Sequence, residues 1–245
     1  MYNWECFSNN LACPRHKAKS NLFAKVENIE SNKIVFSSKY EYQIVDGVPD
    51  LRNTISVYCS SRYTEIHGYV GGNTAGKIHD VDRYIRQLNL KKQQIRKKTI
   101  LLAGAGSGTE LDLLLRYDPE LVVAIDYRDN VRFLAKTYKS NQKTIFFQAD
   151  IQNLPFKNSV FDMSFNSGVF STVRSPELGF REMLYSTKPG GTISIGGIYK
   201  YNEKHQLIEK ARLKHEFHKM DYQQAVNKLS KIIKRRLRIR KIHHF

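Results

Sequence analysis

The chain has 245 residues, of which 41% are hydrophobic, enough to bury a full α/β core and leave residues for a small appended module. Its 40 lysines and arginines outnumber its 23 acidic residues, and the formal net charge of +17 makes an anionic partner a candidate. Three cysteines are too few for a disulfide framework, no apolar run approaches the ~18 residues of a membrane span, and the start lacks a signal-peptide layout, so we expect a cytoplasmic protein.

Residues 1–54 are predicted to form a small β-rich module. The strand-like residues 33–36 and the Asp-Gly-Val-Pro sequence at 46–49 resemble the zinc-ribbon-type module that precedes some methyltransferase domains. In that module two Cys-x-x-Cys pairs usually hold a tetrahedral zinc ion. The corresponding positions here are Cys13, His16, Val35 and Ser38. Because two ligands cannot close a four-ligand shell, we expect a degenerate module without a metal.

Residues 55–97 are predicted to be a linker or a helical lid region. The glycine-rich stretch 67–73 either folds over a ligand as a lid or is a plain linker. Tyr69 within it is one candidate for a catalytic group. The basic residues between 91 and 98 are expected at the surface.

The apolar residues 100–103 lead directly into Gly-x-Gly-x-Gly at 104–108. Glycines permit backbone angles and close ligand approaches that a Cβ would block, and the helix expected at 110–117 presents free N–H groups at its start. The next segment, 121–126, is typical of a buried parallel strand and ends in Asp126. Such a carboxylate can accept hydrogen bonds from both ribose hydroxyls of a nucleoside. A tightly packed turn and a helix-capping aspartate are the structural alternatives.

Four further blocks follow in order. They are a third strand with Ala-Asp-Ile at 149–151, a fourth strand and loop at 161–170, a helix at 177–187, and Lys-Pro-Gly-Gly at 188–191 before a fifth strand that ends at 195. With these blocks, residues 97–200 resemble the class I S-adenosylmethionine-dependent methyltransferases. A dinucleotide-binding oxidoreductase would share the glycine turn and Asp126, but not the later blocks.

The resemblance implies an α/β, Rossmann-like doubly wound parallel sheet at 98–200 and S-adenosylmethionine as the cofactor. It implies that the third-strand aspartate, Asp150, contacts the adenine amino group and that Ile151 packs on the ring. We expect no metal site, because the zinc-ribbon ligand set is incomplete. The cofactor contacts that it predicts are Gly104, Ala105, Gly106, Ser107, Gly108, Asp126, Tyr127, Asp150, Ile151, Asn166 and Ser167.

The chain departs from this family at two places. The family usually has Asp or Glu two residues before the first glycine, where this chain has Leu102. Many small-molecule relatives have two histidines after the fourth strand, where this chain has Ser171 and Thr172. A histidine base therefore cannot be assumed, and Ser171 is a second candidate catalytic group. Methyl transfer mainly requires that an in-line attack is aligned and that water is excluded.

Residues 201–245 are predicted to form a basic helical extension. We expect one helix at 202–220, and only 236–242 alternates enough to be a strand. The sheet edge would then stay open, be covered by the basic helix, or be completed by a second copy in a homodimer. The segment after Asp221 contains no acidic residue, and it could lie on nucleic acid, on an anionic membrane surface, or in solvent.

Three functions stay open. The first is methylation of a small or lipid-linked metabolite, because the loop after the fourth strand resembles that of small-molecule relatives and no Asn-Pro-Pro-Tyr motif occurs. The second is methylation of a ribosomal or transfer RNA base, which the basic charge and a ribbon module would favour. The third is a scaffold that binds S-adenosylmethionine without transferring its methyl group.

Overall fold

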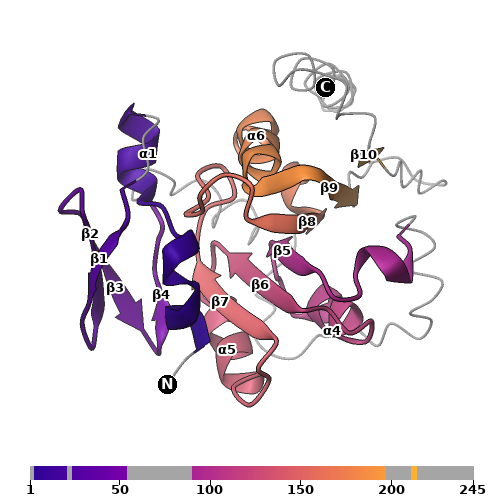
Figure 1. The fold of residues 1–245 in the computed structure, drawn as a ribbon, viewed down its shortest axis with the longest axis horizontal. Helices are drawn as coiled ribbons and strands as arrows, with labels where there is room; N and C mark the ends of the chain where they lie inside the picture. The colour runs from indigo at the N-terminus through magenta and orange to yellow at the C-terminus, as the bar shows by residue number, and fades with distance from the viewer. Residues whose placement is uncertain (1–2, 21–23, 54–89, 197–210, 214–245) are drawn as a thin grey trace, which may run out of the picture.

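The structure is a computed structural model that describes residues 3–20, 24–53, 90–196 and 211–213, and these residues contain two sheets (Figure 1). The smaller sheet lies in the N-terminal part and is antiparallel, with the order β1-β2-β3-β4. Its strands are β1 (Val26–Ile29), β2 (Lys33–Phe36), β3 (Glu41–Val45) and β4 (Val48–Pro49). The predicted β-rich module is thus confirmed. A 3-10 helix, η1 (Asn3–Asn10), and the helix α1 (Pro14–Ser20) precede the sheet and were not predicted.

The larger sheet has the order β10-β9-β8-β5-β6-β7. Its strands are β5 (Thr99–Ala103), β6 (Leu121–Asp126), β7 (Thr144–Gln148), β8 (Phe161–Ser167), β9 (Thr187–Gly196) and β10 (Ala211–Leu213). The strands β5 to β9 are parallel, and this confirms the doubly wound prediction. The chain first runs outward from β5 to β7 and then returns to β8 on the other side of β5, so the topological switch point lies between β5 and β8.

Helices cover both faces of this sheet. They are α4 (Thr109–Leu115), α5 (Asn130–Thr137) and α6 (Pro176–Ser186), with the short 3-10 helices η2 (Lys92–Gln94) and η3 (Val169–Ser171). Alternate residues of β5 point to opposite faces, as a strand requires. Ile100 and Leu102 pack with α4 and α5, whereas Leu101 and Ala103 pack with α6 and the N-terminal module. None of the described helices combines the length and the apolar character that crossing a membrane requires.

An aromatic cluster joins the N-terminal module to the large sheet. Phe7 of η1 lies 6.1 Å from both Phe156 and Phe161, and these two rings meet edge to face at 5.0 Å. All three rings are buried. The module therefore shares one continuous core with the sheet and flanks β7 (Figure 1).

Of the four positions that hold zinc in a ribbon module, two lie at or in α1 and two lie in or after β2. Cys13 is fully buried with its Sγ 3.6 Å from the Tyr42 hydroxyl, and His16 lies in α1. Val35 is in β2, and Ser38 is in the turn before β3. Within the described residues, no group of three or more His, Cys, Asp or Glu side chains is arranged to hold a metal ion.

The predicted Lys-Pro-Gly-Gly turn lies inside β9. Phe161 of β8 pairs with Thr187, and Met163 pairs with Thr192, so two steps along β8 correspond to five along β9. Residues 188–191 therefore loop out of the ladder, and pairing resumes after them.

The helix predicted at 202–220 is wrong at its centre, because Ala211–Leu213 form β10. This strand pairs antiparallel with β9 through Ala211 opposite Ile195 and Leu213 opposite Ile193. A parallel sheet that ended at β9 would present unpaired N–H and C=O groups along its edge, and β10 satisfies part of them. The rest of the predicted extension lies outside the described residues, so its relation to a membrane, nucleic acid or second copy stays a prediction.

A buried ion pair links α1 to α6. Lys17 Nζ lies 2.5 Å from Glu182 Oε2 and donates to the Leu154 carbonyl at 3.2 Å, and Leu154 N donates to the same carboxylate at 3.0 Å. Each of the two charged side chains is only 10% exposed. Removing one partner would leave the other charge buried without compensation.

We therefore expect Lys17→Met to lower the free energy of unfolding by about 3–5 kcal/mol, and the double variant Lys17→Met, Glu182→Leu to recover much of that loss. Urea denaturation of the three proteins measures both effects. Equal stabilities for the single and double variants would show that an uncompensated Glu182 charge is not the cause of the loss.

Candidate functional site

The candidate site lies at the carboxyl ends of β5, β6 and β8. In open parallel sheets, ligands bind in the crevice at the topological switch point, which here lies between β5 and β8. The glycine turn at 104–108 follows β5 directly, and Asn166 and Ser167 end β8. The topology therefore brings two of the sequence-predicted segments to the carboxyl ends of neighbouring strands, at the switch point.

Backbone hydrogen bonds fix the glycine turn on β6. The N–H groups of Gly104 and Ala105 both donate to the Ile125 carbonyl, at 2.9 and 2.8 Å. All three glycines of the motif have positive φ angles, 97° at Gly104, 53° at Gly106 and 92° at Gly108. These angles lie in the region that favours glycine, so the motif is required by the shape of the turn itself.

Two of these glycines face different surroundings. A Cβ on Gly104 would collide with the side chain of Val169, whereas a Cβ on Gly106 would meet nothing within 4 Å. Gly104 is therefore needed because η3 lies against it. The open space beside Gly106 is where a ligand could approach the backbone, and this is a feature that a bound nucleoside requires.

Asp126 ends β6 and contacts the turn through its side chain. Its Oδ2 accepts the N–H of Gly106 at 2.8 Å, and its Oδ1 accepts the N–H of Arg128 at 3.0 Å. Part of the residue reaches the surface, but burial of the carboxyl group raises its pKa, and the N–H groups of Arg128 and Gly106 and the Asn130 side chain oppose this in part. The carboxylate has further acceptor capacity for ribose hydroxyls. The N-cap of α5 is Asp129, so Asp126 is not the helix cap.

Asn166 presents an unpaired acceptor beside the turn. Its Nδ2 donates to the Ala103 carbonyl at 2.7 Å, which fixes the orientation of the amide, and its Oδ1 is buried with no hydrogen-bond partner among the described residues. The family carboxylate expected at position 102 is replaced by Leu102, which is fully buried in the core. A ligand ammonium group placed here would satisfy the Asn166 oxygen.

Asp150 and Ile151 follow the end of β7. Asp126 pairs with Gln148 in the ladder, and the Asp126 carbonyl accepts the N–H of Ala149 at 3.0 Å, so Asp150 lies at the same edge of the sheet as Asp126. Both Asp150 and Ile151 are buried. The Asp150 carboxylate accepts the N–H of Gln152 at 2.8 Å, and its contact with an adenine ring stays a prediction.

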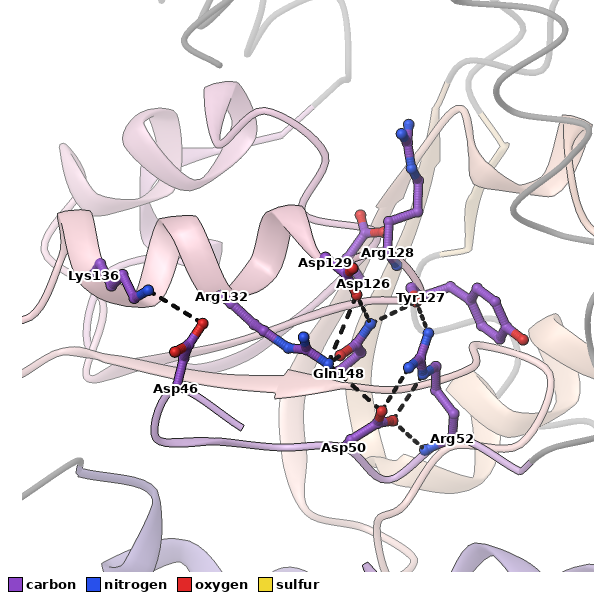
Figure 2. A network of polar contacts seen from close by, with 10 residues as sticks. All are labelled: Asp46, Asp50, Arg52, Asp126, Tyr127, Arg128, Asp129, Arg132, Lys136 and Gln148. Atoms are coloured by element: carbon purple, nitrogen blue, oxygen red, sulfur yellow. Dashed lines mark hydrogen bonds and ion pairs between the residues drawn. The ribbon is translucent and has the colours of Figure 1, made fainter. Parts of the chain in front are cut away.

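Two polar residues that support the site were missed from the sequence. The Asn130 side chain donates to the Gly106 carbonyl and thus holds the turn from the side of α5. Gln148 Nε2 donates to the Tyr127 carbonyl at 3.1 Å and to Asp129 Oδ1 at 2.7 Å (Figure 2). A signal existed for Gln148, which is a lone amide at the end of an apolar strand.

The candidate catalytic residues are less defined. Tyr69 lies outside the described residues. Ser171 lies in η3, after the positive-φ Gly168, and only its backbone is described. The hydroxyl of Thr172 donates to the Val169 carbonyl at 2.8 Å, so it is used within the loop. Ser107 is exposed, with its hydroxyl 3.1 Å from that of Thr109.

Comparison with known proteins agrees with this architecture. Residues 101–195, which include most of β5 to β9, match the family model described as a methyltransferase domain. A 124-residue stretch is 27% identical to malonyl-[acyl-carrier protein] O-methyltransferase of Buchnera aphidicola subsp. Baizongia pistaciae, and covers 49% of this chain and 49% of that protein. The chain thus spans about half the length of the curated relative that it matches.

Two solved structures are also similar. A SAM-dependent methyltransferase from Aquifex aeolicus has a TM-score of 0.44 and 20% identity, with coverage of 51% of this chain and 66% of that chain. An S-adenosyl-L-methionine-dependent methyltransferase from Methanococcus maripaludis, described as putative, has a TM-score of 0.41 and 22% identity, with coverage of 48% and 53%. Residues 101–195 thus match a methyltransferase domain and have the parallel sheet order of a Rossmann-like methyltransferase fold, for which S-adenosylmethionine is the expected cofactor.

The unpaired oxygen of Asn166 predicts different effects on ligands that do and do not carry the amino-acid part of the cofactor. We expect Asn166→Leu to weaken binding of S-adenosylhomocysteine about tenfold, because a buried acceptor for the ammonium group is lost. Binding of 5′-methylthioadenosine, which lacks the amino-acid part, should stay within about twofold. Isothermal titration calorimetry measures both. An equal loss for both ligands would mean that Asn166 acts on the turn and not on the ammonium group.

Proposed function

We propose that this chain is an S-adenosylmethionine-dependent methyltransferase that acts on a small or lipid-linked metabolite. The observation that carries the proposal is the hydrogen bond from the Gly106 N–H to the Asp126 carboxylate, beside a space that none of the described residues fills. This contact lies at the carboxyl ends of β5 and β6, in a part of the chain that matches a methyltransferase domain. A carboxylate and an exposed turn in this position suit the ribose of a nucleoside.

The residues of the crevice divide into two groups along the bound cofactor. Asp126 accepts hydrogen bonds from the ribose, and Tyr127, Asp150 and Ile151 lie on the adenine side. Asn166 and Ser167 lie on the methionine side, at the end of β8. When bound, the cofactor supplies an activated methyl group on a positively charged sulfur, and the protein aligns the acceptor for in-line attack and excludes water.

The loop after β8 favours an acceptor that needs no general base. Ser171 and Thr172 stand where small-molecule relatives have histidines, and the Thr172 hydroxyl is bonded to the loop backbone. A carboxylate acceptor is already ionised at neutral pH and can attack without losing a proton. The similarity to a protein named malonyl-[acyl-carrier protein] O-methyltransferase supports the same acceptor class, an acyl carboxylate.

The acceptor class is tested with the purified protein, methyl-labelled S-adenosylmethionine and a cell extract. We expect label in small or lipid-linked products that release methanol on mild alkaline treatment, as carboxyl methyl esters do. Label confined to RNA would support the base methyltransferase instead. Cofactor binding without any transfer would support the scaffold.

Asp126 provides the test of cofactor binding. We expect Asp126→Ala to abolish calorimetric binding of S-adenosylhomocysteine, because both ribose hydroxyls lose their acceptor and the glycine turn loses the bond at Gly106. Asp162→Ala is the matched control. Asp162 also lies on a strand and its carboxylate accepts a backbone N–H, that of Thr99 at 2.9 Å. It lies near the start of β8, however, at the end of the parallel strands opposite to Asp126. Unchanged affinity in the Asp126 variant would reject the proposal.

The same carboxylate predicts a pH dependence. Burial raises the pKa of Asp126, and the ribose hydroxyls bind its ionised form most strongly, so affinity should fall as the pH drops through this raised pKa. The fall should begin above the pKa of about 3.9 of an ordinary aspartate. A calorimetric profile that stays flat down to that value would contradict the role of Asp126.

A further inference from the structure

The segment that leaves the N-terminal module runs along the free edge of β7. Leu51 N donates to the Gln148 carbonyl at 2.8 Å, and Asp50 forms a parallel bridge with the same residue. Leu51 is fully buried. This segment lies about 50 residues before the part of the chain that matches the methyltransferase domain, yet it reaches the end of the strand beside Asp126.

Arg52 holds Tyr127 at two points (Figure 2). Its Nη1 donates to the Tyr127 carbonyl at 3.1 Å, and its Cζ lies 5.3 Å from the centre of the Tyr127 ring. Asp50 orients the guanidinium group, because Nε donates to Oδ1 at 2.8 Å and Nη2 to Oδ2 at 2.5 Å. The planar fork thus bonds a carboxylate with one side and the Tyr127 backbone with another, while its positive charge lies over the ring in a cation–π contact.

The opposite side of the same loop is held from α5. Arg132 Nη2 donates to Gln148 Oε1 at 2.5 Å, and Gln148 in turn donates to the Tyr127 carbonyl. Arg132 Nη2 also lies 3.7 Å from Asp50 Oδ2. Two arginines and a glutamine therefore converge on one carbonyl and one carboxylate, and Figure 2 shows that they come from three separate segments of the chain.

Tyr127 directly follows Asp126, so any shift of Tyr127 moves the carboxylate that contacts Gly106. We propose that Arg52 is a positioning residue of the cofactor site, through which the N-terminal module sets the affinity for the adenosine part of the cofactor. The inference rests on the proposed function. It extends the site beyond the matched domain to a residue that touches the binding loop and not the reacting atoms.

Arg52→Lys tests this directly, because lysine keeps the charge but loses the fork that bonds Asp50 and the Tyr127 carbonyl together. We expect the Kd of S-adenosylhomocysteine and that of 5′-methylthioadenosine to rise by the same factor, about tenfold, since both ligands contain adenosine. Asn166→Leu should affect only the first ligand, so the two variants give different patterns with the same pair of probes.

Arg15→Lys is the matched control. The Cζ of Arg15, in α1, lies 5.5 and 5.4 Å from the ring centres of Tyr40 and Tyr42 in the same module, away in sequence from the segment 50–52 that reaches Tyr127. This variant changes a similar cation–π contact and should keep wild-type affinity for both ligands. If Arg52→Lys does not fold, Asp50→Asn weakens the same fork and should raise both Kd values by a smaller equal factor.

Wild-type affinity for both ligands in Arg52→Lys, with binding lost in Asp126→Ala, would overturn the inference and leave the proposed function intact. An equal loss in Arg52→Lys and Arg15→Lys would also overturn it, because the module would then act only through overall stability. Failure of the wild-type protein to bind either ligand would overturn the proposed function and the inference with it.

Discussion

The hydrogen bond from the Gly106 N–H to the Asp126 carboxylate is the contact on which the site depends. It joins the turn after β5 to the end of β6, and it holds a partly buried negative charge at the point where the ribose of a nucleoside would lie. The backbone N–H groups that stabilise this charge leave further acceptor capacity on the carboxylate. The bond thus links the turn to the carboxylate and adds to the backbone bonds from Gly104 and Ala105 that fix the turn on β6.

The matched domain packs against the N-terminal module at three places. The N-terminal module shares its aromatic core with the sheet, joins α6 through the Lys17–Glu182 pair, and pairs with the edge of β7 through Leu51. Each contact reaches a different part of the domain. Because the last of them leads to Arg52 and the loop after Asp126, the module is positioned to affect ligand affinity as well as stability.

The strands β5 to β9 and the helices α4 and α6 could be predicted because local pattern and tertiary role agree there, whereas α5 was not predicted. Apolar runs such as Val122–Ile125 are buried on both faces of the sheet. The spacing of the three glycines predicts a tight turn, and all three have the positive φ angles that glycine favours. Asp126 was predicted because the end of a buried strand is a defined place in the fold.

The remaining features depend on contacts that no local pattern encodes. The strand β10 has three residues and is stabilised by its pairing with the edge of β9. The local pattern at 202–220 favoured a helix because it contains no information about this partner strand. Arg52 looks like any other surface cation in a chain of net charge +17, and only the folded structure brings it to Tyr127. The open acceptor of Asn166 likewise depends on the Ala103 carbonyl, which orients the amide.

The most direct test of the account is a crystal structure of the protein with S-adenosylhomocysteine. We expect the ribose hydroxyls about 2.6–3.2 Å from the Asp126 oxygens, with the adenine beside Tyr127 and Ile151. A nucleoside bound away from the crevice between β5 and β8, or one whose ribose faces away from Asp126, would contradict it.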